Sequence, residues 1–237
     1  MKEKKHCSAV VLAAGSGKRM NSDTKKQYML IYGKPVVYYS LKTFQESFVD
    51  EIILVVSPGD VSYCQKEIVE KYGFTKVSHI VEGGRERYHS VAAGLEKVSA
   101  GGYVFIHDGA RPLVTEEILE RAYTCVELSG ACVVGMPVKD TIKIADSDKN
   151  IADTPNRNLV WMVQTPQVFD SSLIKDAYQN LILNEEHLLE QGVSITDDAM
   201  VVERLSGQKV KLVEGSYENI KITTPEDILL AECFLNR

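Results

Sequence analysis

Short apolar runs that alternate with helical stretches constrain the fold of this chain most strongly. These runs are Ala9–Ala14, Glu51–Val56, Val77–Val81, Tyr103–Ile106, Cys132–Val138 and Val210–Val213. Runs rich in β-branched residues are typical of parallel strands that are buried on both faces, and helices connect such strands. The pattern therefore predicts an α/β protein with a mostly parallel, twisted sheet and helices on both faces. Because no linker or repeat divides the 237 residues, we expect a single domain over residues 1–237.

The first apolar run leads directly into a glycine loop with cations. Ala13 and Ala14 precede Gly15, Ser16 and Gly17, and four cations follow closely: Lys18, Arg19, Lys25 and Lys26. Ligands of α/β sheets gather at the carboxyl ends of the strands, and glycines expose backbone N–H groups that bind phosphate. The segment predicts a nucleotide site, although a Gly-x-Gly alone is weak evidence because it also occurs in ordinary strand-to-helix turns.

Two common phosphate motifs do not fit this loop. A P-loop separates its glycines by four residues and places a lysine and a hydroxyl after the second, whereas these glycines are two positions apart. A dinucleotide fingerprint has a third glycine where Met20 stands and an acidic residue about 20 positions further on, at the end of a second strand. A dinucleotide-binding oxidoreductase is therefore disfavoured.

Two further segments offer groups for binding or catalysis. The strand that ends at Ile106 is followed by His107 and Asp108, and an aspartate at a strand's carboxyl end is a candidate Mg²⁺ ligand or, equally, a turn or cap residue. No second histidine or cysteine lies at metal-ligand spacing, so we interpret His107 as structural. Gly83 and Gly84 precede a helix that contains Ser90, and this segment fits either a base-reading edge or a plain turn.

Composition excludes several functional classes. The net charge is −6, from 27 Lys and Arg against 33 Asp and Glu, which argues against a general nucleic-acid binder. Five scattered cysteines disfavour a disulfide framework and a thiolate zinc site. No apolar run reaches the roughly 18 residues of a membrane helix, and no signal-peptide pattern is present. We expect a cytoplasmic protein that binds neither nucleic acid nor membrane.

The segment 139–163 breaks the alternation of strands and helices. Residues 139–144 alternate polar and apolar side chains, a turn cluster follows at 146–150, and the apolar pattern resumes at Ile151. This is a hairpin signature. Because a hairpin has no place in the core of a doubly wound domain, we predict a projecting β-arm that packs against a second copy of the chain.

Taken together, these segments resemble the 2-C-methyl-D-erythritol 4-phosphate cytidylyltransferase family of the nonmevalonate isoprenoid pathway. The matching pieces cover nearly the whole chain in order: residues 12–20, 26–28, 57–60, 83–91, 107–112, 137–143, 156–158, 164–167, 195–199 and 213–221. The resemblance implies a Rossmann-like single domain, a homodimer held by the arm, and the use of CTP and Mg²⁺.

The resemblance also implies roles for individual residues. Arg19 and Lys26 would stabilise the transition state, Arg157 and Lys221 would position the methylerythritol phosphate, and Asp108 would bind the metal. Substrate contacts would come from Arg111, Thr141 and Thr165, with Thr141 and Arg111 as candidates to reach the site of a neighbouring subunit. The nucleotide-binding set would be Ala13, Ala14, Gly15, Ser16, Gly17, Lys26, Gly83, Gly84, Arg87 and Ser90, of which Ala14, Gly84 and Ser90 read the cytosine.

The chain departs from the family pattern at three places. His89 stands where an aspartate is common, Lys25 stands where a proline is usual, and the helical stretch Ala177–Gly192 is longer than usual. The alternatives left open are a ribitol-5-phosphate cytidylyltransferase and, from other classes, the oxidoreductase or a non-catalytic nucleotide-binding protein.

Overall fold

A seven-stranded sheet forms the centre of the computed structural model, which describes residues 4–15 and 24–237. The strand order is β11-β7-β10-β6-β1-β4-β5. The strands are β1 (Cys7–Ala13), β4 (Glu51–Val56), β5 (Val77–Glu82), β6 (Tyr103–Asp108), β7 (Ala131–Pro137), β10 (Trp161–Asp170) and β11 (Lys211–Glu214). All neighbours pair in parallel except β10, which is antiparallel to both β6 and β7. The predicted mostly parallel sheet is confirmed.

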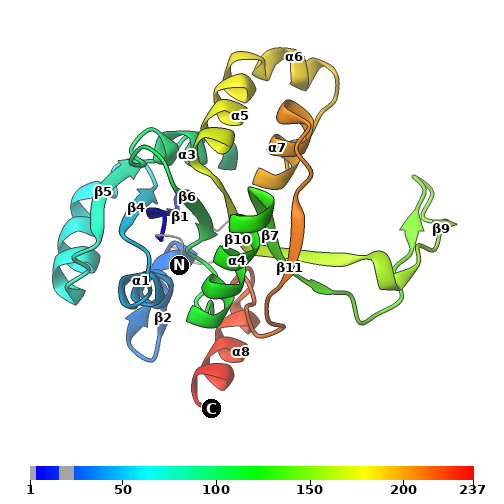
Figure 1. Cartoon of the computed structure of the whole chain (residues 1–237). Coiled ribbons are helices and arrows are strands. Elements are labelled where there is room, and N and C mark those ends of the chain that lie inside the picture. Colours follow the sequence, from blue (N-terminus) through cyan, green and yellow to red (C-terminus); the bar gives the residue numbers. More distant parts are fainter. Residues whose placement is uncertain (1–3, 16–23) are drawn as a thin grey trace.

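Helices cover both faces of the sheet, as the sequence predicts (Figure 1). On one face α1 (Val36–Glu46), α4 (Glu116–Ser129) and the π-type helix η3 (Cys64–Glu70), which continues α2 (Val61–Tyr63), share a buried apolar cluster with Ala9 and Val11 of β1. On the other face α3 (Arg87–Leu95), α5 (Ser171–Leu183) and α7 (Asp198–Ser206) share a second cluster with Val10. Successive residues of β1 thus face opposite layers, which explains why the run is apolar throughout.

Smaller elements complete the chain. A 3₁₀ turn, η2 (Lys26–Tyr28), leads into the short hairpin of β2 (Leu30–Ile31) and β3 (Lys34–Pro35), on which α8 (Pro225–Leu235) packs. Thr224 and Asp227 form a capping box at the start of α8, with Pro225 in the first turn, as predicted. No helix among residues 4–15 and 24–237 combines the length and the apolar character needed to cross a membrane.

Two predictions about secondary structure need correction. Strand β10 was not predicted, because the buried polar residues Gln164, Thr165 and Gln167 interrupt its apolar pattern. The stretch Ala177–Gly192 is not one helix: α5 ends at Leu183, and Asn184 separates it from α6 (Glu185–Glu190). The break places Glu185 at the start of a separate short helix.

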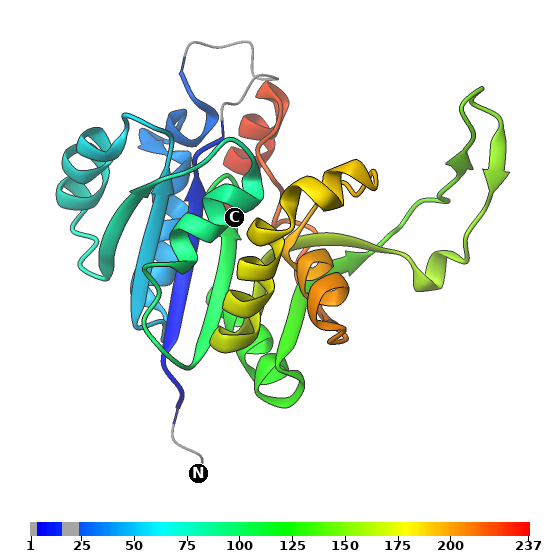
Figure 2. The ribbon, with the colours of Figure 1, turned by 90° about the horizontal axis from the view of Figure 1, so that it is seen from above.

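The segment between β7 and β10 projects from the body of the molecule (Figure 2). Its tip is a hairpin of β8 (Ile144–Ala145) and β9 (Ile151–Asp153), followed by the 3₁₀ turn η4 (Arg157–Leu159). The hairpin is shorter than the alternating pattern indicates, since residues 139–143 form no strand. Ile144, Ile151 and Leu159 expose 50%, 64% and 79% of their surface, so the apolar side chains of the arm have no cover within one chain.

Candidate active site

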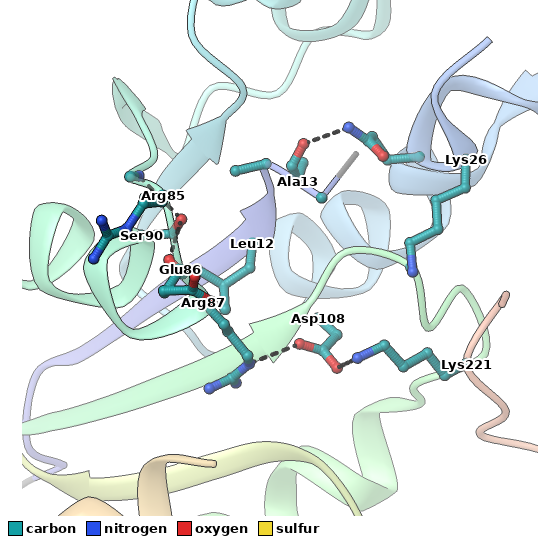
Figure 3. A pocket seen from close by; sticks show the side chains of 14 residues that line it. Leu12, Ala13, Lys26, Arg85, Glu86, Arg87, Ser90, Asp108 and Lys221 are labelled. Atoms are coloured by element: carbon teal, nitrogen blue, oxygen red, sulfur yellow. Dashed lines mark hydrogen bonds and ion pairs between the residues drawn. The ribbon is translucent and has the colours of Figure 1, made fainter. Parts of the chain in front are cut away.

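A cavity of about 330 Å³ opens at the carboxyl ends of β1 and β6 (Figure 3). Small ligand sites begin at about this size. The cavity brings together many of the predicted residues: Ala13, Ala14, Gly15, Lys26, Gly84, Arg87, Ser90, Asp108 and Lys221. Ser16, Gly17 and Arg19, also predicted for this site, lie outside the residues that the structure describes.

The wall formed by the Gly83-Gly84 segment is packed too closely for larger residues. A Cβ atom on Gly83 would lie 2.6 Å from both the Ala14 Cβ and the Ser90 Oγ. The Gly84 N–H donates to the Ser90 hydroxyl at 3.2 Å, and that hydroxyl lies 3.3 Å from the Glu86 carbonyl, to which it donates. Glycine at these positions lets the backbone form the cavity wall directly, as a base-reading edge needs.

Lys26 approaches the cavity from the opposite side (Figure 3). Its neighbour Gln27 is buried and donates from Nε2 to the Ala13 carbonyl at 2.7 Å, which ties η2 to the end of β1. Lys25, the departure from the family pattern, pairs with Asp60 at 2.6 Å, and Tyr28 donates to the same carboxylate at 3.0 Å. These contacts hold the turn that carries Lys26, and Lys25 contributes to them where a proline could not.

Asp108 lies at the centre of a cluster of cations. Its Oδ2 is 2.7 Å from Lys221 Nζ and 3.9 Å from Arg111 Nε, and its Oδ1 is 3.5 Å from Arg87 Nε. Burial alone would raise the pKa of this carboxyl, but the three cations outweigh burial and hold the pKa far below its usual range. Asp108 is therefore ionised at every physiological pH.

Arg87 is held by residues that sequence analysis did not single out. Its Nη1 and Nη2 donate to the two carboxylate oxygens of Asp198, both at 2.7 Å, and Asp198 is fully buried. The Tyr178 hydroxyl donates to the same carboxylate. Burial would lower the pKa of Arg87, but Asp198 and Asp108 raise it well above its normal value, so the guanidinium is a fixed charge.

A second cavity of about 310 Å³ adjoins the first and shares Arg87, Asp108 and Lys221 with it. Arg111 and Thr165 line this second cavity. Arg111 donates to the Asn219 carbonyl of its own chain at 2.7 Å, which holds the guanidinium beside this cavity. A contact of Arg111 with a neighbouring subunit stays a prediction.

His107 orients the hydroxyl of Thr165, which lines the second cavity. The ring is fully buried, its Nε2 donates to the Arg111 carbonyl at 3.2 Å, and its Nδ1 therefore accepts from the Thr165 hydroxyl at 3.1 Å. Thr165 in turn accepts from the Asp108 N–H at 3.0 Å. Burial lowers the pKa of His107 to about 4, which keeps the ring neutral, and a structural role agrees with these contacts.

Arg157 and Thr141 lie elsewhere. Both are exposed residues of the arm, and Arg157 donates to the Lys139 carbonyl at 3.0 Å. Neither lines the two cavities, so within one chain Arg157 does not meet Lys221. The sequence predicts that Arg157 and Lys221 position the same substrate phosphate, whereas in one chain the projecting arm holds Arg157 away from Lys221.

The residues present fit a divalent cation that arrives with the nucleotide. Mg²⁺ is commonly held by one or two carboxylates together with substrate phosphates and water. Asp108 supplies one such carboxylate, and the side chain of its partner Lys221 is 37% exposed. Over residues 4–15 and 24–237 no cluster of three His, Cys, Asp or Glu side chains offers a complete protein-made metal site.

Comparison with known proteins agrees with this architecture. The family model of IspD, 2-C-methyl-D-erythritol 4-phosphate cytidylyltransferase, matches residues 7–237. The chain belongs to this family.

Relatives of the same name include the protein of Lachnoclostridium phytofermentans, 51% identical over 96% of this chain and 95% of the relative. The protein of Lachnospira eligens is 52% identical over 96% of this chain and 98% of the relative. The solved 4-diphosphocytidyl-2C-methyl-D-erythritol synthase of Anaerococcus prevotii superposes with a TM-score of 0.83 at 36% identity and covers 98% of this chain and 96% of its own. The chain is thus a nucleotidyltransferase of the cytidylyltransferase type, and the oxidoreductase, the non-catalytic protein and the ribitol-phosphate enzyme are not favoured.

Proposed function

We propose that this cytidylyltransferase joins CTP to 2-C-methyl-D-erythritol 4-phosphate, releasing pyrophosphate and 4-diphosphocytidyl-2-C-methyl-D-erythritol. The observation that carries the proposal is the pair of adjoining cavities with Arg87, Asp108 and Lys221 in their common wall. One cavity is large enough for a nucleotide, the other offers Arg111 and Thr165 to a second anion, and both substrates would meet at the shared cations.

The acceptor supplies its own nucleophile. A phosphate monoester has its second pKa near ~6, so its oxygen is already an anion at neutral pH. This oxygen attacks the α-phosphorus of CTP, a new phosphorus–oxygen bond forms, and the bond to the departing pyrophosphate breaks. Because no proton has to be removed, the neutral and fully buried His107 is not needed as a base.

Charge neutralisation is the main task of the protein. Two unit charges about 4 Å apart repel by roughly 4 kcal/mol at the effective dielectric of a protein surface, and both substrates are polyanions. Lys26 and Arg87 face the first cavity, and Lys221 lies between the two. Arg19, outside the described residues, is proposed to add a further charge. Fixed cations lower the barrier because they need no reorganisation when the charge moves.

Asp108 is the proposed ligand of Mg²⁺. The ion, when bound, neutralises phosphate charge and holds the triphosphate oxygens in one orientation. Asp108 is oriented for this by its own backbone N–H bond to Thr165 and by its ion pairs. The Gly83-Gly84 backbone, Ala14 and Ser90 are proposed to read the cytosine.

A homodimer built through the arm would complete the acceptor site. The exposed Ile144, Ile151 and Leu159 give the arm an apolar surface to bury, and Arg157 and Thr141 sit on the same segment. We propose that the partner subunit contributes these two residues to the cavity lined by Lys221. A cytoplasmic location stays a prediction.

Release of pyrophosphate tests the function directly. The purified chain is incubated with CTP, Mg²⁺ and either methylerythritol phosphate or ribitol 5-phosphate. Rapid release with methylerythritol phosphate alone is expected. Release with ribitol 5-phosphate alone, or with neither, would contradict the proposal.

A further inference from the structure

One carboxylate of α6 contacts three side chains at the start of α3, one just before the helix and two in its first turn. Glu185 Oε1 accepts a hydrogen bond from the Tyr88 hydroxyl at 2.7 Å and lies 3.6 Å from Arg85 Nη2. Its Oε2 lies 3.0 Å from His89 Nε2. These contacts join residues nearly 100 positions apart and involve two of the places where the chain departs from the family pattern.

The hydrogen bonds of His89 fix the tautomer of its ring. The backbone N–H of Glu86 donates to His89 Nδ1 at 3.2 Å in the capping box of α3. Nδ1 therefore carries no proton, and in the neutral ring Nε2 carries it and donates to Glu185. The ring is thus held at both ends, by the start of α3 and by α6.

His89 also packs against the wall of the first cavity. A Cβ atom on Gly84 would lie only 2.3 Å from the His89 Cβ, so the Gly84 backbone rests directly against the base of that side chain. Gly83 is packed in the same way against Ala14 and Ser90. Gly84 and Ser90 both line the first cavity, whereas Glu185 and His89 do not.

We infer that Glu185 is a positioning residue of the nucleotide site, which through Tyr88 and His89 fixes the segment Gly83–Ser90 against the base of the bound nucleotide. The inference rests on the proposed use of the first cavity for CTP. Glu185 governs nucleotide affinity and the discrimination between pyrimidine bases. It leaves the chemical step to Lys26, Lys221 and Arg87, which belongs to this segment but is anchored separately by Asp198.

The ionisation of the groups agrees with these roles. Hydrogen bonds from Tyr88 and His89 lower the pKa of Glu185, so the acceptor is a carboxylate at neutral pH. Burial, reinforced by Glu185, raises the pKa of Tyr88 to about 12, so the phenol keeps the proton that it donates. The bond between Tyr88 and Glu185 therefore joins a phenol to a carboxylate at neutral pH.

Steady-state kinetics of Glu185→Ala test the inference, with Glu186→Ala as the matched control. Glu186 is the adjacent, exposed residue in the first turn of α6 and carries the same charge. Glu185→Ala removes the hydrogen bonds with Tyr88 and His89 and the ion pair with Arg85. KM for CTP should therefore rise about 3- to 10-fold. The kcat and the KM for methylerythritol phosphate should stay unchanged, as for a residue that acts on binding alone. The preference for CTP over UTP should fall.

A double-mutant comparison separates positioning from a direct charge effect. In a chain that already carries Tyr88→Phe and His89→Ala, the further change Glu185→Ala should add little to KM, because the two side chains through which Glu185 acts are altered and only the exposed Arg85 remains. The Tyr88→Phe change alone keeps the ring in place and should raise KM for CTP in the same direction. Thermal unfolding of each variant checks that it is folded, and Tyr88→Phe supplies the kinetic comparison if Glu185→Ala is not.

Several outcomes would overturn the inference. An unchanged KM for CTP in Glu185→Ala, an equal rise in Glu186→Ala, or the same rise in both backgrounds would each show that Glu185 does not act through Tyr88 and His89. A parallel loss of kcat and of both affinities would show general damage instead. Failure of the wild-type chain to turn over CTP would refute the proposed function, which is a different result.

Discussion

Lys221 Nζ lies 2.7 Å from Oδ2 of Asp108, and this ion pair stands in the common wall of the two cavities. A carboxylate that orients a lysine there places one positive charge where an acceptor phosphate and the α-phosphate of a nucleotide would meet. Asp108 is also the proposed ligand of a divalent cation, which would compete with Lys221 for this carboxylate. Arg87 and Arg111 keep the balance of charge around Asp108 positive in either case.

Lys221→Ala should weaken the use of methylerythritol phosphate about 10- to 100-fold in kcat/KM, with CTP binding largely intact. The lysine is proposed to hold the acceptor phosphate, and Lys26 and Arg87 remain to bind the triphosphate. Calorimetric titration with each substrate measures the two affinities separately. Lys209→Ala, an exposed lysine outside both cavities, is the control. Equal loss of both affinities would contradict a role specific to the acceptor, and loss of CTP affinity alone would assign Lys221 to the nucleotide instead.

Lys26→Ala should lower kcat by roughly 10²-fold or more, because a fixed charge that faces the developing negative charge is removed. Single-turnover kinetics at saturating CTP isolate the chemical step from binding. Lys66→Ala removes an exposed lysine of η3 and controls for the change in net charge. Wild-type turnover in a folded Lys26→Ala protein would remove this residue from the mechanism.

Asp108→Asn should abolish most of the metal-dependent activity. The amide retains the size of the carboxylate but binds a hard cation much more weakly and no longer pairs with Lys221. Activity is measured against Mg²⁺ concentration for both proteins. An identical metal dependence would show that the ligand lies elsewhere.

The buried ring of His107 should make the protein less stable as the pH falls from about 6.5 towards 4. The folded-state pKa is lowered to about 4 from the usual 6.5, so in this window only the unfolded chain binds the proton. Stability that is present above pH 6.5 is therefore lost on acidification, by up to about 3 kcal/mol from this group.

Urea unfolding at several pH values measures the effect. His107→Gln should flatten the dependence between pH 4 and 6.5, whereas His79→Gln, at an exposed histidine, should leave it as in the wild type. Parallel curves for the wild type and His107→Gln would contradict the assignment.

Mixing two inactive variants tests whether the arm serves the neighbouring subunit. If Arg157 acts on the partner's site, Lys221→Ala and Arg157→Ala chains that exchange subunits form heterodimers with one intact site. Activity should then recover to about a quarter of the wild type at equal amounts, because half of the dimers are mixed and each has one intact site of two.

The same experiment has a clear negative result. If Arg157 acts within its own chain, every site in the mixture lacks one of the two cations, and activity does not recover. Light scattering coupled to gel filtration establishes whether dimers form at all. Monomers at working concentration would refute the assembly.

The sequence predicts those parts of the molecule that are determined locally. The apolar runs predict strand ends at Ala14 and Ile106, and the structure has them at Ala13 and Asp108, within two residues. The start of α8 follows from Thr224 and Pro225. Such signals lie within a few residues of each other and need no knowledge of the fold.

Other features depend on contacts between distant residues. The hydrogen bonds between Arg87 and Asp198 span 111 positions, and those between Glu185 and Tyr88 span 97. Strand β10 could not be recognised from the sequence because Gln164 and Gln167 are polar yet buried. Gln164 donates a hydrogen bond to the Ser216 carbonyl, and Gln167 accepts one from the backbone N–H of Ala199 at the start of α7. The N-cap at Asp197, whose side chain accepts from the Met200 N–H, is the one local signal that points to Asp198.

Strand β10 runs as ten consecutive residues from the foot of the arm, at Trp161, through the side chains that line the second cavity, to Asp170, which pairs with Tyr103 of β6. A force on the arm and a ligand against Thr165 therefore act on one continuous piece of backbone. Shortening or replacing the arm should therefore also disturb the second cavity, because the residues that anchor the arm form part of the cavity wall.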